Sequence, residues 1–194
     1  MHITRLTRLI ISCVAVLAAL TASAHAGQMP ATQPGDPLDP RTYAPESTPF
    51  LAVHATGTQK YACQANGTWL FSDPVAVLYD TAKPEKAVGS HYLNFATGRP
   101  VWAFKDGSSV EAARKVTVPG GAGNIASLLL QAVVTTAGPD GDRLATTSWV
   151  QRLNPSGGLA PDGACAPGDT IAVPYRTDYV FWKAIGAGGD ESLD

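Results

Sequence analysis

The chain carries little charge and no run of basic residues. Only 15% of its 194 residues are Asp, Glu, Lys or Arg. A surface that binds nucleic acid or an anionic membrane needs a basic stripe to neutralise phosphates, so neither is expected as a partner. The 19 glycines and 15 prolines favour strands and turns over surface-charged helices.

Signatures of the common enzyme classes are also missing. The sequence has no G-x-S-x-G elbow, no H-E-x-x-H zinc motif and no dinucleotide fingerprint. The glycine-rich stretch 119–124 lacks the Lys-Ser/Thr ending of a phosphate-binding loop. No spacing selects two of the many acids as a pair for glycoside hydrolysis. We therefore predict no cofactor and no metal, and an enzymatic role stays open.

Long apolar runs are absent except near the N-terminus. Residues 1–26 combine a basic start, the run LIISCVAVLAAL at 9–20 and an Ala-x-Ala ending, which together are typical of a cleaved signal peptide. The run is shorter than the about 20 apolar residues that span a bilayer, so no membrane span is predicted. A lipid anchor at Cys13 is the alternative, but the apolar run continues past it. We expect cleavage before Gly27 and a secreted or periplasmic protein.

Cleavage would leave 168 residues, with 12 basic and 16 acidic side chains, a length typical of one domain. Residues 27–49 contain six prolines and no periodic apolar pattern, which predicts a disordered leader. The folded β domain is predicted over 50–185. The small and acidic residues 186–194 are predicted to form a flexible tail.

Cysteine is scarce. Of the three cysteines, Cys13 lies in the predicted signal peptide, which leaves Cys63 and Cys165. Two thiols in an oxidising compartment most often form a disulfide, and the loop closed here, about 100 residues, corresponds to about 4 to 5 kcal/mol in the chain-entropy description. A metal site is the competing interpretation, but this wide spacing lacks the C-x-x-C pairs of zinc sites.

Runs rich in strand-forming residues alternate with turn signals between residues 50 and 182. This pattern predicts an all-β fold, an antiparallel sandwich or barrel of about eight or nine short strands with little helix. Asp73-Pro74 interrupts one run and requires an edge, a bulge or a break there. Residues 124–134 could start a helix at Asn124, but their β-branched end favours a buried strand. Residues 152–169 are predicted to be the longest irregular stretch, tethered by Cys165.

Two histidines remain after processing. Alternation along residues 50–57 places His54 on the face opposite Val53 and Ala55, which is typical of a solvated strand histidine. His91 instead shares a predicted face with Leu93 and Phe95. An imidazole there either bonds a backbone carbonyl in the core or lies at the rim of a cavity, and the sequence leaves both open.

The stretch 88–110 concentrates the remaining candidates. Trp102 lies ten residues after Tyr92, and Asp106-Gly107 predicts a hairpin turn. We consider three functions: a non-catalytic binding module for a small molecule or glycan with His91, Tyr92, Trp102 and Asp106 at the site, a hydrolase-like enzyme with His91 as base and Asp106 as acid, and a structural envelope or surface protein. Turn formation alone also accounts for Asp106.

Four segments, GTQKYACQANGTW, VGSHYLNFATGRPVWAFKDGSSV, VQRLNPSGGLAPDGAC and VPYRTDYVFW, resemble a family of uncharacterised secreted proteins from bacteria and filamentous fungi. The chain departs from the family pattern by Pro155-Ser156 before the glycine pair and by three extra residues after Tyr92. The resemblance implies an exported β domain with one disulfide, and it implies no established reaction. The residues that carry the pattern are Gly57, Gln59, Tyr61, Cys63, His91, Trp102, Asp106, Gly107, Ser108, Gly157, Gly158, Pro161 and Cys165.

Overall fold

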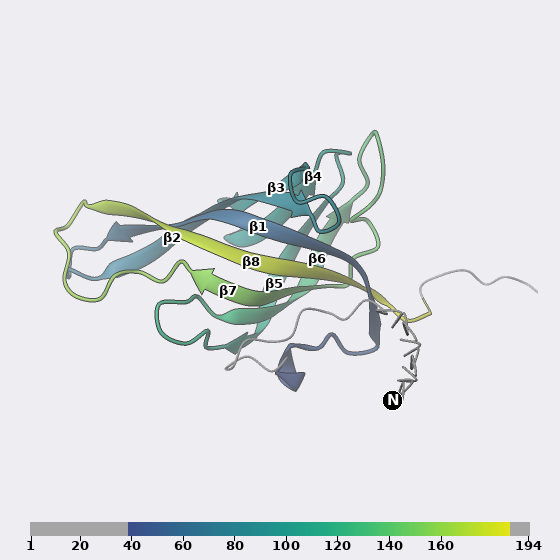
Figure 1. Cartoon of the computed structure of the whole chain (residues 1–194). Coiled ribbons are helices and arrows are strands. Elements are labelled where there is room, and N and C mark those ends of the chain that lie inside the picture. Colours follow the sequence, from purple (N-terminus) through teal and green to yellow (C-terminus); the bar gives the residue numbers. More distant parts are fainter. Residues whose placement is uncertain (1–38, 187–194) are drawn as a thin grey trace, which may run out of the picture. The chain divides into compact units, whose positions relative to one another are not determined.

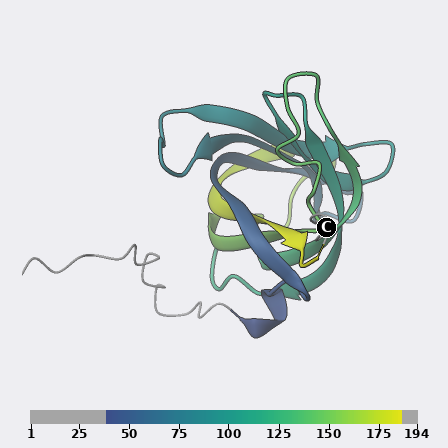
Figure 2. The same cartoon turned by 90° about the vertical axis from the view of Figure 1, so that its right-hand side faces the viewer.

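The protein folds as a closed barrel of eight antiparallel strands in chain order (Figure 1). The structure is a computed structural model that describes residues 39–186. Each strand pairs with the next, and β8 pairs with β1 to close the ring seen in Figure 2. After a short 3-10 turn, η1 (Pro40–Thr42), the strands are β1 (Ser47–Cys63), β2 (Trp69–Asp80), β3 (Ala87–Asn94), β4 (Arg99–Phe104), β5 (Ser109–Val118), β6 (Ser127–Thr136), β7 (Trp149–Gly157) and β8 (Thr170–Ala184).

The predicted all-β class and the low helix content are confirmed. Of the two predicted architectures, sandwich and barrel, the structure has the barrel. The stretch 124–134 is a strand for most of its length, as its β-branched end indicated. The strands are not all short as predicted, because β1 extends over 17 residues. The predicted signal peptide and most of the predicted leader and tail lie outside the described residues.

The folded part begins earlier than Phe50, where the sequence places its start. β1 begins at Ser47, and the residues before it are already packed on the barrel. Thr42 is 1% exposed, and its hydroxyl accepts a hydrogen bond from the Gln151 side chain at 3.1 Å. A segment rich in proline can thus be ordered by a few tertiary contacts that its composition does not reveal.

The bulge expected around Asp73-Pro74 is present in β2. The pairing with β1 shifts from Lys60 opposite Asp73 to Tyr61 opposite Phe71, so Ser72, directly before this dipeptide, has no partner in the ladder. Pro74 has no N–H to donate to the ladder, and the extra residue of the bulge lies two positions before it. The Asp73 carboxylate accepts the Leu93 backbone N–H of β3 at 3.1 Å, which links the irregular part of β2 to β3.

One end of the barrel is closed by the β6–β7 loop. Leu144 of this loop has no exposed surface and packs in the barrel core with Val110, Val150 and Phe181. The Leu144 N–H donates to the Ser108 hydroxyl at 3.2 Å, which joins the loop to the β4–β5 turn. A closely packed apolar core therefore fills this half of the barrel.

The β7–β8 loop, residues 158–169, lies at the other end, where Leu159 borders the cavity. The predicted disulfide Cys63–Cys165 is present, with the two Cα atoms 5.8 Å apart, and it fastens this loop to the end of β1. Gly158 has a φ of +84°, and a Cβ there would lie 2.8 Å from the Cβ of Tyr175, so only glycine fits. The irregular stretch is shorter than the predicted 152–169, because its first six residues belong to β7.

Among residues 39–186, the structure contains no helix whose length and apolar character would suit a membrane crossing.

Candidate functional site

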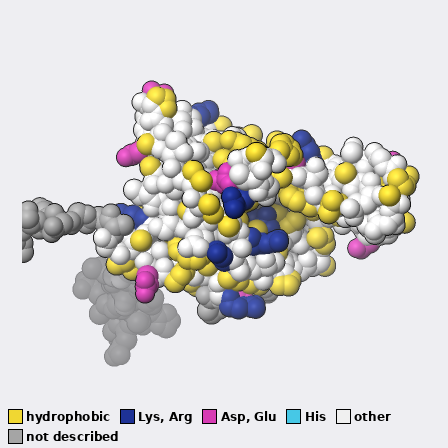
Figure 3. Space-filling view, turned by 180° about the vertical axis from the view of Figure 1, so that it is seen from behind, with side chains coloured by type: hydrophobic (Ala, Val, Ile, Leu, Met, Phe, Trp, Pro, Cys, Tyr) yellow, Lys and Arg dark blue, Asp and Glu magenta, His cyan; other side chains and the backbone are white. Residues whose placement is uncertain are grey.

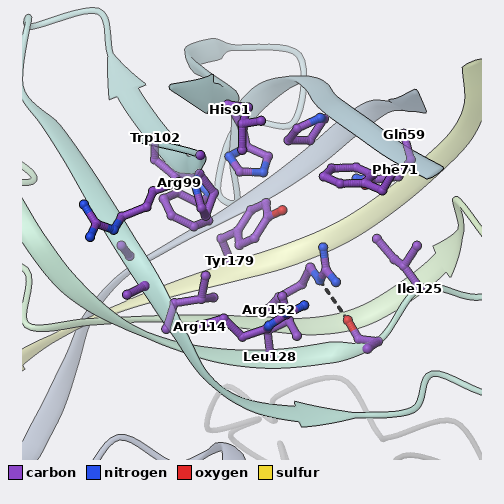
Figure 4. A pocket seen from close by; sticks show the side chains of 18 of the residues that line it. Gln59, Phe71, His91, Arg99, Trp102, Arg114, Ile125, Leu128, Arg152 and Tyr179 are labelled. Atoms are coloured by element: carbon purple, nitrogen blue, oxygen red, sulfur yellow. Dashed lines mark hydrogen bonds between the residues drawn. The ribbon is translucent and has the colours of Figure 1, made fainter. Parts of the chain in front are cut away.

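A cavity of about 630 Å³ lies inside the half of the barrel next to the β7–β8 loop. All eight strands contribute side chains to its lining, so the cavity is an interior feature of the barrel (Figure 4). Pockets of about 300 to 1,000 Å³ hold small organic ligands in proteins, so the volume suits such a molecule. The larger side chains of the lining include Gln59, Phe71, His91, Arg99, Trp102, Arg114, Leu128, Arg152 and Tyr179.

Three aromatic rings form the inner wall of the cavity. His91 of β3 stacks on Trp102 of β4, with ring centroids 4.5 Å apart and an angle of 19° between the planes. Tyr179 of β8 lies 5.1 Å from the His91 ring and meets Trp102 edge-on at 5.2 Å. The register brings the first pair together, since His91 is directly opposite Trp102. The interior face of the barrel is therefore aromatic where the cavity is deepest.

The hydrogen bond of His91 determines its tautomer. Its Nδ1 lies 2.9 Å from the carbonyl oxygen of Val101, and because a carbonyl only accepts, Nδ1 carries the proton. Burial, which disfavours the charged ring, lowers the pKa of His91 to about 3. The bond to Val101 opposes this shift, and the positive charge of Arg152 adds to it. His91 is therefore neutral at physiological pH and a weak base.

Several buried polar atoms around the cavity have no hydrogen-bond partner within residues 39–186. They are Gln59 Nε2, Trp102 Nε1, and the hydroxyls of Tyr175 and Tyr179. A buried polar group without a partner costs about 1 to 3 kcal/mol, so native proteins keep few of them. The fifth such atom, Thr147 Oγ1, belongs to the β6–β7 loop at the other end. Four of five thus gather in the cavity half.

The two tyrosine hydroxyls are close enough to perturb each other without forming a hydrogen bond of standard geometry. Burial raises the pKa of Tyr175 and of Tyr179, because both phenolates would lie away from water. The charge of Arg152 opposes the rise in both cases. Both hydroxyls therefore stay protonated and can donate as well as accept.

Three arginines reach the cavity, and they differ in their partners. Arg99 pairs with Glu111 at 3.3 Å. Arg152 of β7 donates through Nε to the Ala126 carbonyl at 2.8 Å, drawn as the dashed line in Figure 4. Neither Arg152 nor Arg114 of β5 has an acidic partner within the described part of the chain. Figure 3 shows Lys and Arg side chains gathered near the centre of the face behind Figure 1, where the surface is hollowed.

The structure brings His91 and Trp102 together, and it places the other two predicted site residues elsewhere. Tyr92 is 40% exposed and points to the outer side of the barrel, as alternation from His91 requires. Asp106 lies in the β4–β5 turn, where its Oδ1 accepts from the Ser108 N–H and hydroxyl and its Oδ2 from the Arg143 N–H. Burial raises and these hydrogen bonds lower the pKa of Asp106, with a net decrease. Asp106 thus holds the closed end together.

Two further expectations from strand alternation have mixed outcomes. His54 faces outward as predicted, and its Nδ1 lies 2.6 Å from an Asp178 carboxylate oxygen. Leu93 lines the cavity with His91, but Phe95 is 75% exposed because β3 ends one residue earlier, at Asn94. Alternation therefore holds only as far as the strand extends.

The sequence patterns did not identify as site residues the side chains that give the cavity its polarity: Gln59, Arg114, Arg152 and Tyr179. Arg152 alternates with Val150, which is fully buried, so an arginine on an apolar strand face was the available signal. Arg114 gives no comparable signal because a register shift follows it in β5. No group of three or more metal-ligating side chains occurs within residues 39–186.

An eight-stranded antiparallel barrel with an interior cavity at one end defines the protein as an up-and-down β-barrel domain. The chain belongs to the family described as "Protein of unknown function (DUF3455)", whose model matches residues 44–183. That match covers β1 to β7 and all of β8 except its last residue. Neither a curated protein nor a solved structure matches the chain.

Proposed function

We propose that this protein is a non-catalytic binding module that takes up a small organic molecule inside its barrel. The observation that carries the proposal is a cavity of about 630 Å³ surrounded by buried polar atoms that lack partners. Buried polar groups without hydrogen-bond partners cost stability, and a bound molecule with matching polar atoms would offset that cost. The interior position and the modest volume favour a small molecule over a glycan chain.

His91 and Trp102 form the inner wall of the proposed site, and Tyr92 and Asp106 are not part of it. The stacked rings offer an apolar surface, and an apolar or aromatic ligand body gains both burial and ring contacts there. Within residues 39–186 the cavity lining includes no Ser, Thr, Cys, Asp or Glu. Because His91 is also a weak base, no observation favours the hydrolase, and we do not propose it.

The protein acts outside the cytoplasm in this proposal. The N-terminal sequence pattern is that of a signal peptide, and the disulfide Cys63–Cys165 is compatible with an oxidising compartment. A ligand taken up there would be a molecule present in the periplasm or outside the cell.

Fluorescence of N-phenyl-1-naphthylamine, a neutral aromatic probe that brightens in apolar sites, tests the binding function. We expect saturable binding by the wild-type protein. Leu128→Trp adds bulk to the cavity lining, while Val77→Trp adds the same side chain on the outer face of β2, where Val77 is 40% exposed. The first variant should raise the dissociation constant of the probe at least about tenfold, which corresponds to a loss of about 1.4 kcal/mol of binding free energy.

The second variant should bind like wild type, and both should melt cooperatively. Absence of saturable binding by the wild-type protein contradicts the proposal. Equal binding by the two folded variants contradicts it as well, because the probe would then lie outside the barrel.

A further inference from the structure

We infer that the cavity selects organic anions, molecules with an apolar or aromatic body and one anionic group held by Arg114 and Arg152. The inference rests on the proposed binding function and specifies its ligand class. Two independent observations carry it: arginines at the cavity without acidic partners, and unpartnered polar atoms that are mainly donors.

The register places the two arginines on either side of one strand. Arg114 of β5 is directly opposite Leu130 of β6, and Arg152 of β7 is directly opposite Leu128. Both arginines line the cavity, together with these two leucines. The positions of Arg114 and Arg152 thus flank the apolar side chains that β6 contributes to the lining, and a ligand with one apolar and one anionic part would match this combination.

Neither charge is neutralised within the described residues. The third arginine, Arg99, has its carboxylate partner Glu111, which also accepts a hydrogen bond from Asn94 at 2.8 Å. The Nε of Arg152 donates to the Ala126 carbonyl, and the guanidinium also lies within interaction range of the Tyr179 hydroxyl, so both of these neighbours are neutral groups. A partly buried guanidinium without a counterion is unfavourable, and a bound anion would remove that cost.

The unpartnered atoms favour the same ligand class. Gln59 Nε2 and Trp102 Nε1 can only donate hydrogen bonds, and the hydroxyls of Tyr175 and Tyr179 can donate as well. A donor-rich cavity is matched by a ligand rich in acceptors. The guanidinium fork pairs two N–H groups with two oxygens of a carboxylate, sulfonate or phosphate, which adds orientation to charge.

The open position of the arginines also explains where the anionic group would lie. Arg114 is exposed at the rim and Arg152 is partly buried, whereas His91, Trp102 and Tyr179 are almost fully buried. An apolar body would therefore enter first and stack near Trp102, with its charged end toward the rim. A neutral His91 suits this orientation because it adds no charge to the inner wall.

Two probes that share one aromatic skeleton test the inference. 8-Anilinonaphthalene-1-sulfonate carries a sulfonate that N-phenyl-1-naphthylamine lacks, so the ratio of their dissociation constants isolates the anionic group. We expect the wild-type protein to bind the sulfonate about 10- to 100-fold more tightly, the range for charge-assisted hydrogen bonds. Arg152→Gln with Arg114→Gln should abolish this preference, which is measured as the ratio of the two dissociation constants in the same variant.

Arg176→Gln is the matched control, because Arg176 is exposed on β8 and does not line the cavity. It should retain the wild-type preference. If the double variant does not fold, the salt dependence of probe binding to the wild-type protein serves instead. Raising the ionic strength should weaken binding of the sulfonate probe and leave binding of the neutral probe unaffected.

Equal affinity for the two probes, or a preference that survives both substitutions, overturns the anion inference while the binding proposal stands. Failure to bind either probe overturns both. Competition with 1-naphthaleneacetate and its neutral amide extends the comparison to carboxylates: displacement by the carboxylate at lower concentration supports the inference, and equal displacement contradicts it.

Discussion

The two ends of this barrel use the same eight strands for opposite purposes. At the closed end, Leu144, Val150 and Phe181 have no exposed surface, and Asp106 and Ser108 satisfy the backbone of the covering loop. At the cavity end, space remains between the strands and buried polar atoms lack partners. The difference teaches that a small barrel can place its apolar packing in one half and keep a cavity in the other.

The cavity end relies on a covalent link where the closed end relies on packing. The β7–β8 loop is held by Cys63–Cys165, by the Cys165 N–H donating to the Gly67 carbonyl at 3.1 Å, and by the Tyr61 hydroxyl donating to the Gly158 carbonyl at 2.6 Å. Cys63 and Cys165 are 102 positions apart in sequence, so the bridge strongly restricts the unfolded chain. Each end can therefore be perturbed by a different kind of substitution.

Removal of the disulfide should have the largest effect. Cys63→Ser with Cys165→Ser is expected to lower the free energy of unfolding by about 4 kcal/mol, since the closed loop is about 100 residues long. Urea denaturation of the variant and of the wild type measures the difference. In limited proteolysis of the folded variant, we expect cleavage in 158–169 before cleavage in 137–148. An unchanged free energy of unfolding, or first cleavage in 137–148, would contradict the assignment of the bridge to the cavity end.

Truncation of one leucine at each end sharpens the comparison. Leu144→Ala should lower the free energy of unfolding by about 3 kcal/mol because it opens a void in close packing. Leu128→Ala should cost less than about 1.5 kcal/mol, because Leu128 is only partly buried and already borders a cavity. Chemical denaturation of both variants tests the difference, and equal losses would show that the two ends are packed alike.

The pH dependence of stability probes the buried wall of the cavity. The pKa of His91 is about 3 in the folded protein, below the usual 6.5 of a histidine side chain, so between these pH values the unfolded chain binds the extra proton. Stability is therefore full above pH 6.5 and falls as the pH falls, by about 2 kcal/mol between pH 6.5 and pH 5. The neighbouring Tyr179, whose pKa is raised by burial, adds no proton-binding step over this range.

Comparison of His91→Phe with wild type isolates this contribution. The variant should lose about 2 kcal/mol less than wild type between pH 6.5 and pH 5 in denaturant titrations. The pH profile of His54→Gln, a substitution on the outer face, should differ from that of His91→Phe as the wild-type profile does. Identical pH profiles for His91→Phe and wild type would mean that His91 is charged or exposed in solution.

The smallest effect is expected at Asp106. Asp106→Ala removes hydrogen bonds to Ser108 and Arg143 at the closed end and should lower the free energy of unfolding by about 1 kcal/mol. Hydrogen exchange in 137–148 should become faster, and binding of N-phenyl-1-naphthylamine should stay unchanged. Loss of probe binding with normal stability would instead return Asp106 to the binding site.

Local patterns predicted single turns, a bulge and the disulfide better than they predicted the cavity. The Asp106-Gly107 turn, the bulge near Pro74 and the bridge Cys63–Cys165 follow from short-range chemistry that is visible in the sequence. Alternation also identified His91 as inward-facing. These features depend on a few neighbouring residues and on the compartment.

The cavity could not be predicted from local sequence patterns, because its lining depends on the register of all eight strands. Arg114 and Arg152 are 38 positions apart and lie on either side of β6 only through its pairing with β5 and β7. Tyr92 was assigned to the site through its closeness to His91 in sequence, although neighbouring strand residues face opposite sides. The choice of a barrel over a sandwich required the pairing of β8 with β1, which no local pattern specifies.

The indole N–H signals of the four tryptophans test the central claim most directly. Two-dimensional ¹H–¹⁵N NMR, with Trp102→Phe to assign the cavity signal, follows each indole during titration with N-phenyl-1-naphthylamine. We predict that the Trp102 signal shifts saturably, since Trp102 lines the cavity without a hydrogen-bond partner, while Trp182, whose Nε1 bonds Gln151 at 3.2 Å, keeps its position. A stationary Trp102 signal at saturating probe would contradict binding inside the barrel.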